Sequence, residues 1–62
     1  MARATTEHMQ TLGLCMRGCR RFFTARGLDW SEVRRGGVDT RWLRATGDAL
    51  AIRLADHAER QG

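Results

Sequence analysis

Three arginines are the residues of this chain whose type and spacing best predict a chemical role. Arg17, Arg20 and Arg21 lie three and four residues apart, a spacing that brings them together on one side of a helix. No acidic residue between positions 8 and 28 neutralises them. A guanidinium donates parallel hydrogen bonds to a phosphate or a carboxylate, so the cluster predicts an anionic partner, either a nucleic acid or an acidic protein.

The net positive charge of the chain is concentrated in the same region. Residues 1–28 contain five arginines and one glutamate, whereas residues 29–62 contain six arginines and six acidic residues, so the net charge of +4 belongs to the first part. All eleven lysine or arginine positions are arginine. Bidentate recognition of anions explains this preference, and so does the codon bias of a GC-rich genome. The alternative to a binding role is that the arginines only form a solvent-exposed charged face.

Five other arginines have a structural explanation. Each falls in the last turn of a predicted helix, where a cation complements the helix dipole; they are Arg26, Arg34, Arg35, Arg44 and Arg60. The predicted binding residues are therefore Arg17, Arg20 and Arg21.

Two cysteines and two histidines are numerically enough for a tetrahedral zinc site. Cys15 and Cys19, however, fall in one continuous apolar period, whereas structural zinc sites usually place their cysteines across a turn. The pattern predicts reduced, inward-facing thiols without metal, and cysteines four apart on a regular helix do not reach disulfide geometry. His57, one turn after Leu54, is predicted to be partly buried with a backbone or carboxylate partner.

The remaining polar residues do not form a recognisable set of nucleophile, base and orienting acid. We therefore expect no catalytic residues, no metal, no cofactor and no small-molecule substrate. No run approaches the roughly 18 apolar residues that span a bilayer, and the first residues lack the apolar centre of a secretory signal. The expected location is the cytoplasm of a bacterial host cell, without membrane contact.

The elements that position the arginines are predicted to be helices. The 62 residues are 42% hydrophobic and contain no proline, which fits one small domain near the lower size limit for a stable core. Residues 1–9 have no apolar period and are predicted to be a flexible tail before a helical domain over 10–62. From Leu12, apolar residues recur every three or four positions, which predicts a helix over 12–26 that ends at Gly27.

Helix caps divide the rest of the chain. Asp29 with Glu32 has the spacing of a capping box, Asp39 is a second N-cap, and Thr46 or Asp48 is a third. The helices that they start are predicted over 30–35, 40–45 and 49–60. The predicted fold class is therefore all-α, a small bundle of about four helices with the two short ones in the middle.

A longer pattern joins these elements: Cys15-x3-Cys19-Arg20-x-Phe22-Phe23-x3-Gly27-Leu28-Asp29-Trp30, then Gly37-Val38-Asp39 and Leu43-x-Ala45-Thr46-Gly47-Asp48-Ala49. The pattern, which covers roughly Cys15 to Ala58, resembles short proteins without assigned activity that are encoded in prophages and tailed phages of proteobacteria. The resemblance implies a phage-encoded accessory or structural-region protein, and it assigns no site residues.

The sequence thus predicts a non-enzymatic helical module that binds an acidic protein or DNA through its arginine face. It has no long helix with Asn, Gln and Arg at its start, so sequence-specific DNA reading is not expected. The competing interpretation is a structural homo-oligomer in which leftover apolar surface, including Trp30 or Trp42, is buried between copies and the arginines serve solubility only. The oligomeric state is left open between monomer and weak homo-oligomer.

Overall fold

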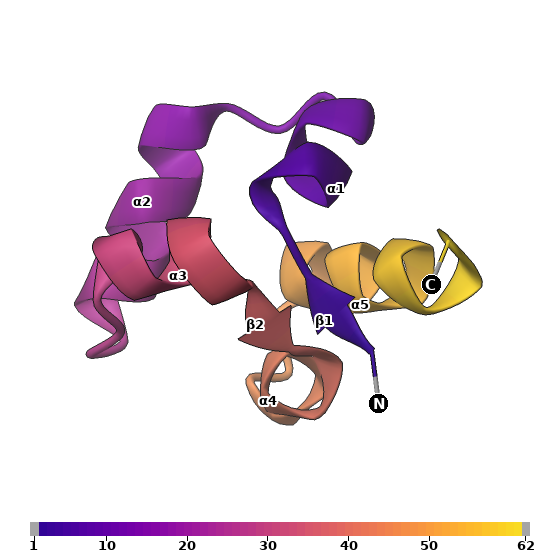
Figure 1. Ribbon diagram of the computed structural model, residues 1–62. Helices are drawn as coiled ribbons and strands as arrows, with labels where there is room; N and C mark the ends of the chain where they lie inside the picture. Colours follow the sequence, from indigo (N-terminus) through magenta and orange to yellow (C-terminus); the bar gives the residue numbers. More distant parts are fainter. Residues whose placement is uncertain (1, 62) are drawn as a thin grey trace.

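Residues 2–61, which the computed structural model describes, form five helices and one pair of short strands (Figure 1). In chain order these are β1 (Arg3–Ala4), α1 (Thr6–Thr11), α2 (Met16–Ala25), α3 (Trp30–Gly36), β2 (Val38–Asp39), α4 (Thr40–Ala45) and α5 (Ala49–Gln61). The prediction of a small helical domain is confirmed, but the fold is not purely all-α because of the two strands. In this part of the chain no helix has the length and apolar character needed to cross a membrane.

The last three helices begin where their predicted caps place them. Asp29 accepts a hydrogen bond from the N–H of Ser31 at 3.0 Å, and Asp39 accepts one from the N–H of Arg41 at 2.8 Å. Asp48 accepts one from the N–H of Ala51 at 3.0 Å. The helices predicted over 30–35, 40–45 and 49–60 are confirmed as α3, α4 and α5.

Loss of the Asp29 cap should destabilise the fold measurably. We expect Asp29→Ala to lower the free energy of unfolding by about 0.5 to 2 kcal/mol, the usual range for losing an N-cap side chain. Urea denaturation followed by tryptophan fluorescence measures the change. Glu32→Ala is the matched control, because Glu32 lies in the same first turn while the cap bond goes to Ser31. Equal stabilities of the two variants would contradict a capping role.

The helix predicted over 12–26 is wrong in its first part, because the chain turns at Gly13. The N–H of Gly13 donates to Gln10 O at 2.9 Å, and the N–H of Leu14 donates to Met9 O at 3.0 Å. This pair of bonds is the Schellman arrangement that ends a helix, and it requires the φ of +77° that Gly13 adopts. α2 therefore starts only at Met16, with Cys15 as its N-cap residue.

The prediction that residues 1–9 form a flexible tail is also corrected, over residues 2–9; residue 1 lies outside the described part. Ala4 and Met9 are both 0% exposed. α1 begins with a reciprocal cap, in which the N–H of Thr5 donates to His8 Nδ1 at 3.0 Å and the N–H of His8 donates to Thr5 Oγ1 at 3.5 Å. The N-terminal segment is thus part of the core.

The two strands tie this segment to the middle of the chain. β1 pairs with β2 in antiparallel register, Arg3 opposite Asp39 and Ala4 opposite Val38. The Arg3 guanidinium adds hydrogen bonds to the carbonyls of Gly36 at 2.7 Å and Gly37 at 3.0 Å. Arg3 therefore has a structural role at the end of α3.

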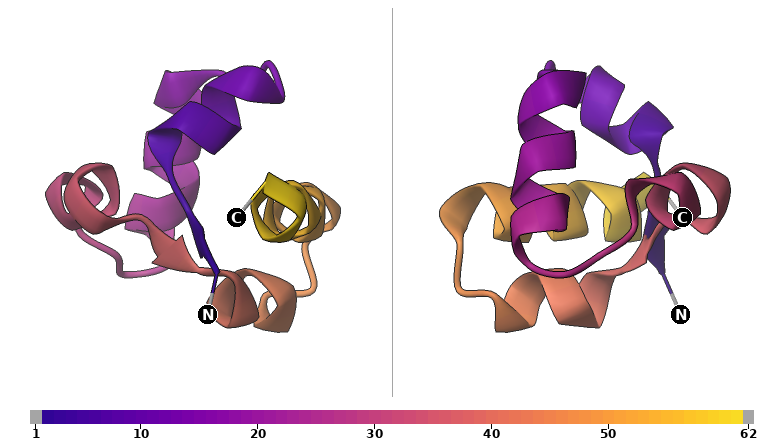
Figure 2. Two further views of the ribbon diagram at one scale, coloured as in Figure 1. Left: turned by 45° about the vertical axis from the view of Figure 1, so that its right-hand side comes forward. Right: turned by 90° about the vertical axis from the view of Figure 1, so that its left-hand side faces the viewer.

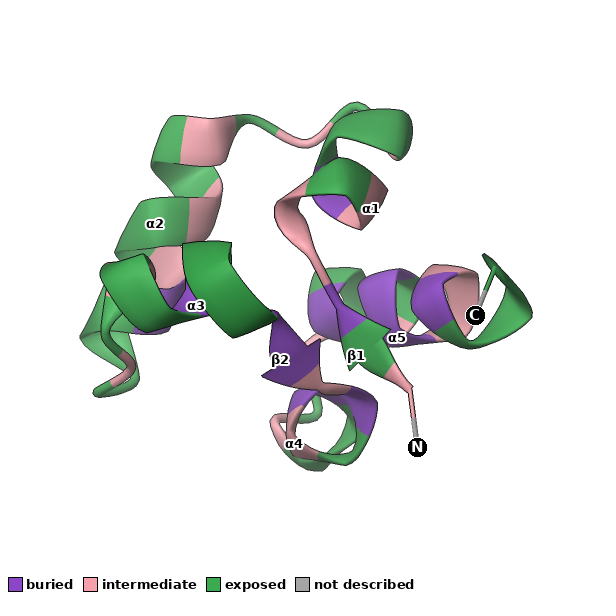
Figure 3. Cartoon of the chain, in the orientation of Figure 1, coloured by how far each residue is buried: buried purple, intermediate pink, exposed green. Residues whose placement is uncertain are grey.

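The core lies where all the elements meet (Figure 3). Its largest fully buried side chains are Phe23, Met9 and Leu43. Both tryptophans pack on Phe23, with ring centroids at 6.2 Å for Trp30 and 5.9 Å for Trp42. Both tryptophans are half-buried, so each packs on the core and keeps part of its surface in solvent.

Candidate functional site

α2 holds the three predicted binding arginines on its exposed side. Arg17, Arg20 and Arg21 are all exposed, whereas Phe23 on the same helix is buried and Cys19 and Phe22 are half-buried. The apolar stripe predicted for this helix therefore faces inward and leaves the arginines in solvent. Their location agrees with the prediction, and their role stays a prediction.

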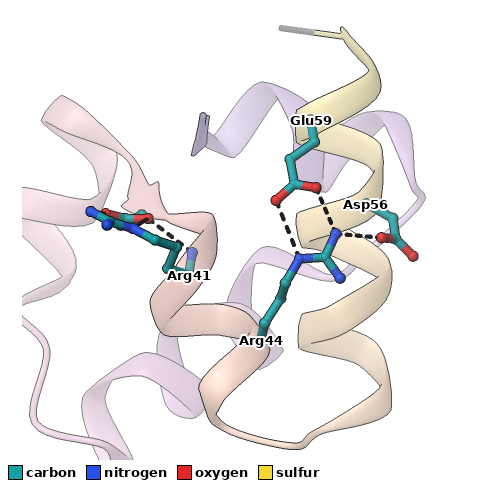
Figure 4. A network of polar contacts seen from close by, with 5 residues as sticks. Arg41, Arg44, Asp56 and Glu59 are labelled. Carbon is teal, nitrogen blue, oxygen red and sulfur yellow. Dashed lines mark hydrogen bonds and ion pairs between the residues drawn. The ribbon is translucent and has the colours of Figure 1, made fainter. Parts of the chain in front are cut away.

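The ion pairs of the described residues involve other arginines, so the positive charge of the arginine face is not paired with a carboxylate. Arg44 on α4 is paired with Asp56 at 2.6 Å and with Glu59 at 2.6 Å, both on α5, and Arg41 is paired with Asp39 at 3.0 Å (Figure 4). Within residues 2–61 no carboxylate lies within ion-pair distance of the three arginines on α2.

The pairs have electrostatic consequences for their members. The hydrogen bonds from Arg44 hold the pKa of the Glu59 carboxyl below its usual value, with a smaller effect of Thr40. The Arg41 side chain does the same to the pKa of Asp39, assisted by the Arg41 backbone N–H. Three of the six acidic groups of residues 29–62, Asp39, Asp56 and Glu59, are thus engaged with arginines of the same half.

The other arginines of the basic half are also occupied. Arg3 donates to the backbone at Gly36 and Gly37. The Arg26 guanidinium carbon lies 3.9 Å from the centre of the Phe22 ring, a cation–π contact. Arg17, Arg20 and Arg21 are therefore the arginines of the basic region for which the described residues, 2–61, supply no such contact.

The two cysteines are free thiols in different environments. The prediction that both face inward is wrong for Cys15, which is exposed because the break at Gly13 makes it the residue before α2. The N–H groups of Gly18 and Arg17 lower the pKa of the Cys15 thiol, whereas burial raises the pKa of the half-buried Cys19 thiol. The helix N-terminus thus favours the Cys15 thiolate.

The two histidines meet each other, not the cysteines. The rings of His8 on α1 and His57 on α5 lie edge to face, with centroids 5.6 Å apart. His57 is half-buried as predicted, but its aromatic contact is the His8 ring, where a backbone or carboxylate partner was predicted. Among residues 2–61 no group of three or more His, Cys, Asp or Glu side chains is placed to hold a metal ion.

An open apolar groove lies along the inward-facing side of α2. Its volume is about 360 Å³, and its walls come from α2, the segment before it and the first turns of α5. The apolar side chains that line it include Leu14, Cys19, Phe22, Leu50 and Leu54. In Figure 2 the right-hand view shows α2 crossing the first half of α5.

Leu50 is the groove residue that sequence reasoning missed. The apolar period of the last helix predicts it on the core face, yet its side chain is 49% exposed. The reason is its place in the first turn of α5, where the opposing wall of α2 leaves the groove open. No signal in the sequence separates it from the buried Leu54, because both belong to one helical period.

Comparison with protein-family models, with curated proteins and with solved structures gives no match to this chain.

Proposed function

We propose that the protein is a non-enzymatic cytoplasmic binding module that contacts an acidic surface of a partner protein through Arg17, Arg20 and Arg21. The observation that supports this function is the absence, within residues 2–61, of any ion pair to these three exposed arginines. Guanidinium groups that the fold leaves in solvent can each give two hydrogen bonds to a carboxylate without breaking an internal contact.

The apolar groove to which the other side of α2 contributes favours an acidic protein over DNA. Phosphates and base edges offer no apolar surface of matching shape, whereas the core of a protein interface is apolar with arginine enriched in it. The resemblance to prophage-encoded proteins makes phage or host proteins the candidates for this partner.

Substitution of all three arginines should weaken the binding. We expect R17Q/R20Q/R21Q to weaken binding to polyglutamate at low salt by roughly 3- to 100-fold, the sum of three exposed charge pairs. Titration calorimetry, or the change of amide chemical shifts during a titration, measures the affinity for polyglutamate. The matched control is R34Q/R35Q/R60Q, which removes the same charge from exposed positions on α3 and α5.

Three outcomes would contradict this function. Equal weakening in both triple variants would show that only the net charge matters. Binding to duplex DNA with a log–log salt slope that falls by about three units in R17Q/R20Q/R21Q, without polyglutamate binding, would identify a nucleic acid as the partner. No binding to either polyanion would leave the arginines as solubility groups.

Exposure of Leu50 supports a second candidate, the structural homo-oligomer. A large apolar side chain that is 49% exposed in the groove is available for contact between copies. Sedimentation over a range of protein concentrations distinguishes this function, since a homo-oligomer gains mass with concentration and a monomeric binding module does not.

A further inference from the structure

The groove between α2 and α5 has a hydrophobic floor that the fold leaves partly unburied. Leu50 is 49% exposed, and Leu14, Cys19 and Phe22 are half-buried. Contact with further apolar atoms would remove this surface from water, at about 25 cal/mol for each Å². A groove of about 360 Å³ has room for a few apolar side chains.

The rim of the groove is positive. The Arg26 guanidinium stacks on the ring of Phe22, which is itself a wall of the groove. Arg21 is exposed and follows the groove residue Gly18 by three positions on α2, so the two are neighbours on the helix surface.

The wall of the groove that α5 forms also has an arginine next to it. Arg53 is exposed and follows Leu50 by three positions on α5. Asp48, an acid in the lining, is engaged by the N–H of Ala51, for which its carboxylate is the cap acceptor. The groove therefore combines an apolar floor, one carboxylate engaged in a helix cap, and arginines next to both walls.

We infer that this groove is the docking site for an amphipathic helix of a partner protein whose apolar stripe is flanked by acidic residues. An amphipathic helix presents apolar side chains every three or four residues to such a groove and satisfies its own backbone hydrogen bonds. Acidic residues beside the stripe would meet Arg21, Arg26 and Arg53. The inference rests on the proposed function, because it specifies an amphipathic helix as the part of the acidic partner that binds.

A second copy of this chain fits the groove less well. Its net charge of +4 would oppose the same arginines, and like charges placed together in an interface are unfavourable. Three of its seven acidic residues are also engaged in their own chain, Asp39 with Arg41, and Asp56 and Glu59 with Arg44. Charge complementarity therefore favours a different, acidic partner.

The direct test uses a synthetic peptide with leucine at every third or fourth position and glutamate at most others. Its control is a peptide of the same composition in scrambled order, which has equal charge but no stripe. We expect the striped peptide to bind the full chain more tightly and to shift the amide resonances of Gly18, Phe22 and Leu50. Equal affinity for the two peptides would overturn the groove inference.

Variants at the groove floor locate the site. Leu50→Ala should weaken binding of the striped peptide by roughly 5-fold through lost apolar contact, and Leu50→Glu by about 10-fold or more. Ala49→Glu is the matched control, since it adds the same charge to an exposed neighbouring position; its effect should stay within about 2-fold. Circular dichroism of each variant checks the fold.

The outcomes separate the inference from the proposed function. If Leu50→Glu and Ala49→Glu bind the striped peptide equally, the groove inference is overturned, while the proposed function still stands if R17Q/R20Q/R21Q binds polyglutamate poorly. If R17Q/R20Q/R21Q binds polyglutamate as tightly as the unmodified chain, the proposed function is wrong, independently of the result for the Leu50 variants. Self-association that Leu50→Glu abolishes would identify a second copy as the occupant and overturn the inference.

Discussion

Gly37→Ala is expected to unfold much of this protein. Gly37 adopts φ of +76° with ψ of −171°, a region essentially restricted to glycine, and another residue there costs about 1 to 3 kcal/mol. An added Cβ would also lie 2.7 Å from the carbonyl oxygen of Ala4, a backbone atom of β1. We therefore expect a loss of more than about 2 kcal/mol in the free energy of unfolding, a large share of the stability of so small a domain.

Urea denaturation followed by tryptophan fluorescence measures this loss, because Trp30 and Trp42 both pack against the core residue Phe23. Gly36→Ala is the matched control one position away. Beyond its chain neighbours and its own helix backbone, no described atom lies within 4 Å of the added Cβ, and alanine is the better helix former, so this variant should be neutral or more stable by up to about 1 kcal/mol. Similar stability of both variants would show that β1 does not pack against Gly37.

Met9→Ala is expected to destabilise the fold by about 2 to 5 kcal/mol, the range for removing a fully buried large side chain. Met9 is 0% exposed and is among the largest side chains with no solvent contact. The cost combines the lost apolar burial with the cavity that remains, because the neighbouring core side chains cannot fully collapse into it. Urea and thermal denaturation measure the change.

Met16→Ala is the matched control for this prediction. Met16 is a methionine at the start of α2 that is only half-buried, so its loss should cost clearly less. Equal effects of the two substitutions would mean that α1 is not part of the core. The comparison therefore tests directly whether residues 2–11 belong to the folded domain.

The two ends of the predicted helix over 12–26 show how far local sequence information reaches. Gly27-Leu28 ends α2 with the bonds of a Schellman motif, and the sequence predicted that end. Gly13-Leu14 ends α1 with the same bonds, but the helix before it was not recognised. Its cap pairs Thr5 with His8 in place of the usual Glu or Gln, so the capping-box signature is missing.

The exposed arginine cluster was also accessible to sequence reasoning. An apolar stripe with period 3.6 forces the intervening positions outward, which is where Arg17, Arg20 and Arg21 lie. The assignment of Arg44 to a helix dipole was incomplete, since its partners are Asp56 and Glu59, which come twelve and fifteen residues later. A pair of that separation depends on how α4 packs on α5.

By itself, the sequence determined the features that depend on neighbouring residues: the caps at Asp29 and Asp39, the three C-terminal helices and the side of α2 that faces solvent. It left the cap of α5 open between Thr46 and Asp48, and the structure shows Asp48. Only the tertiary structure decided that β1 pairs with β2, that Met9 is core, and that Leu50 lines an open groove while Leu54 is buried. The physical reason is that caps and helical periods act within a few residues. Burial and strand pairing instead depend on segments brought together from distant parts of the chain.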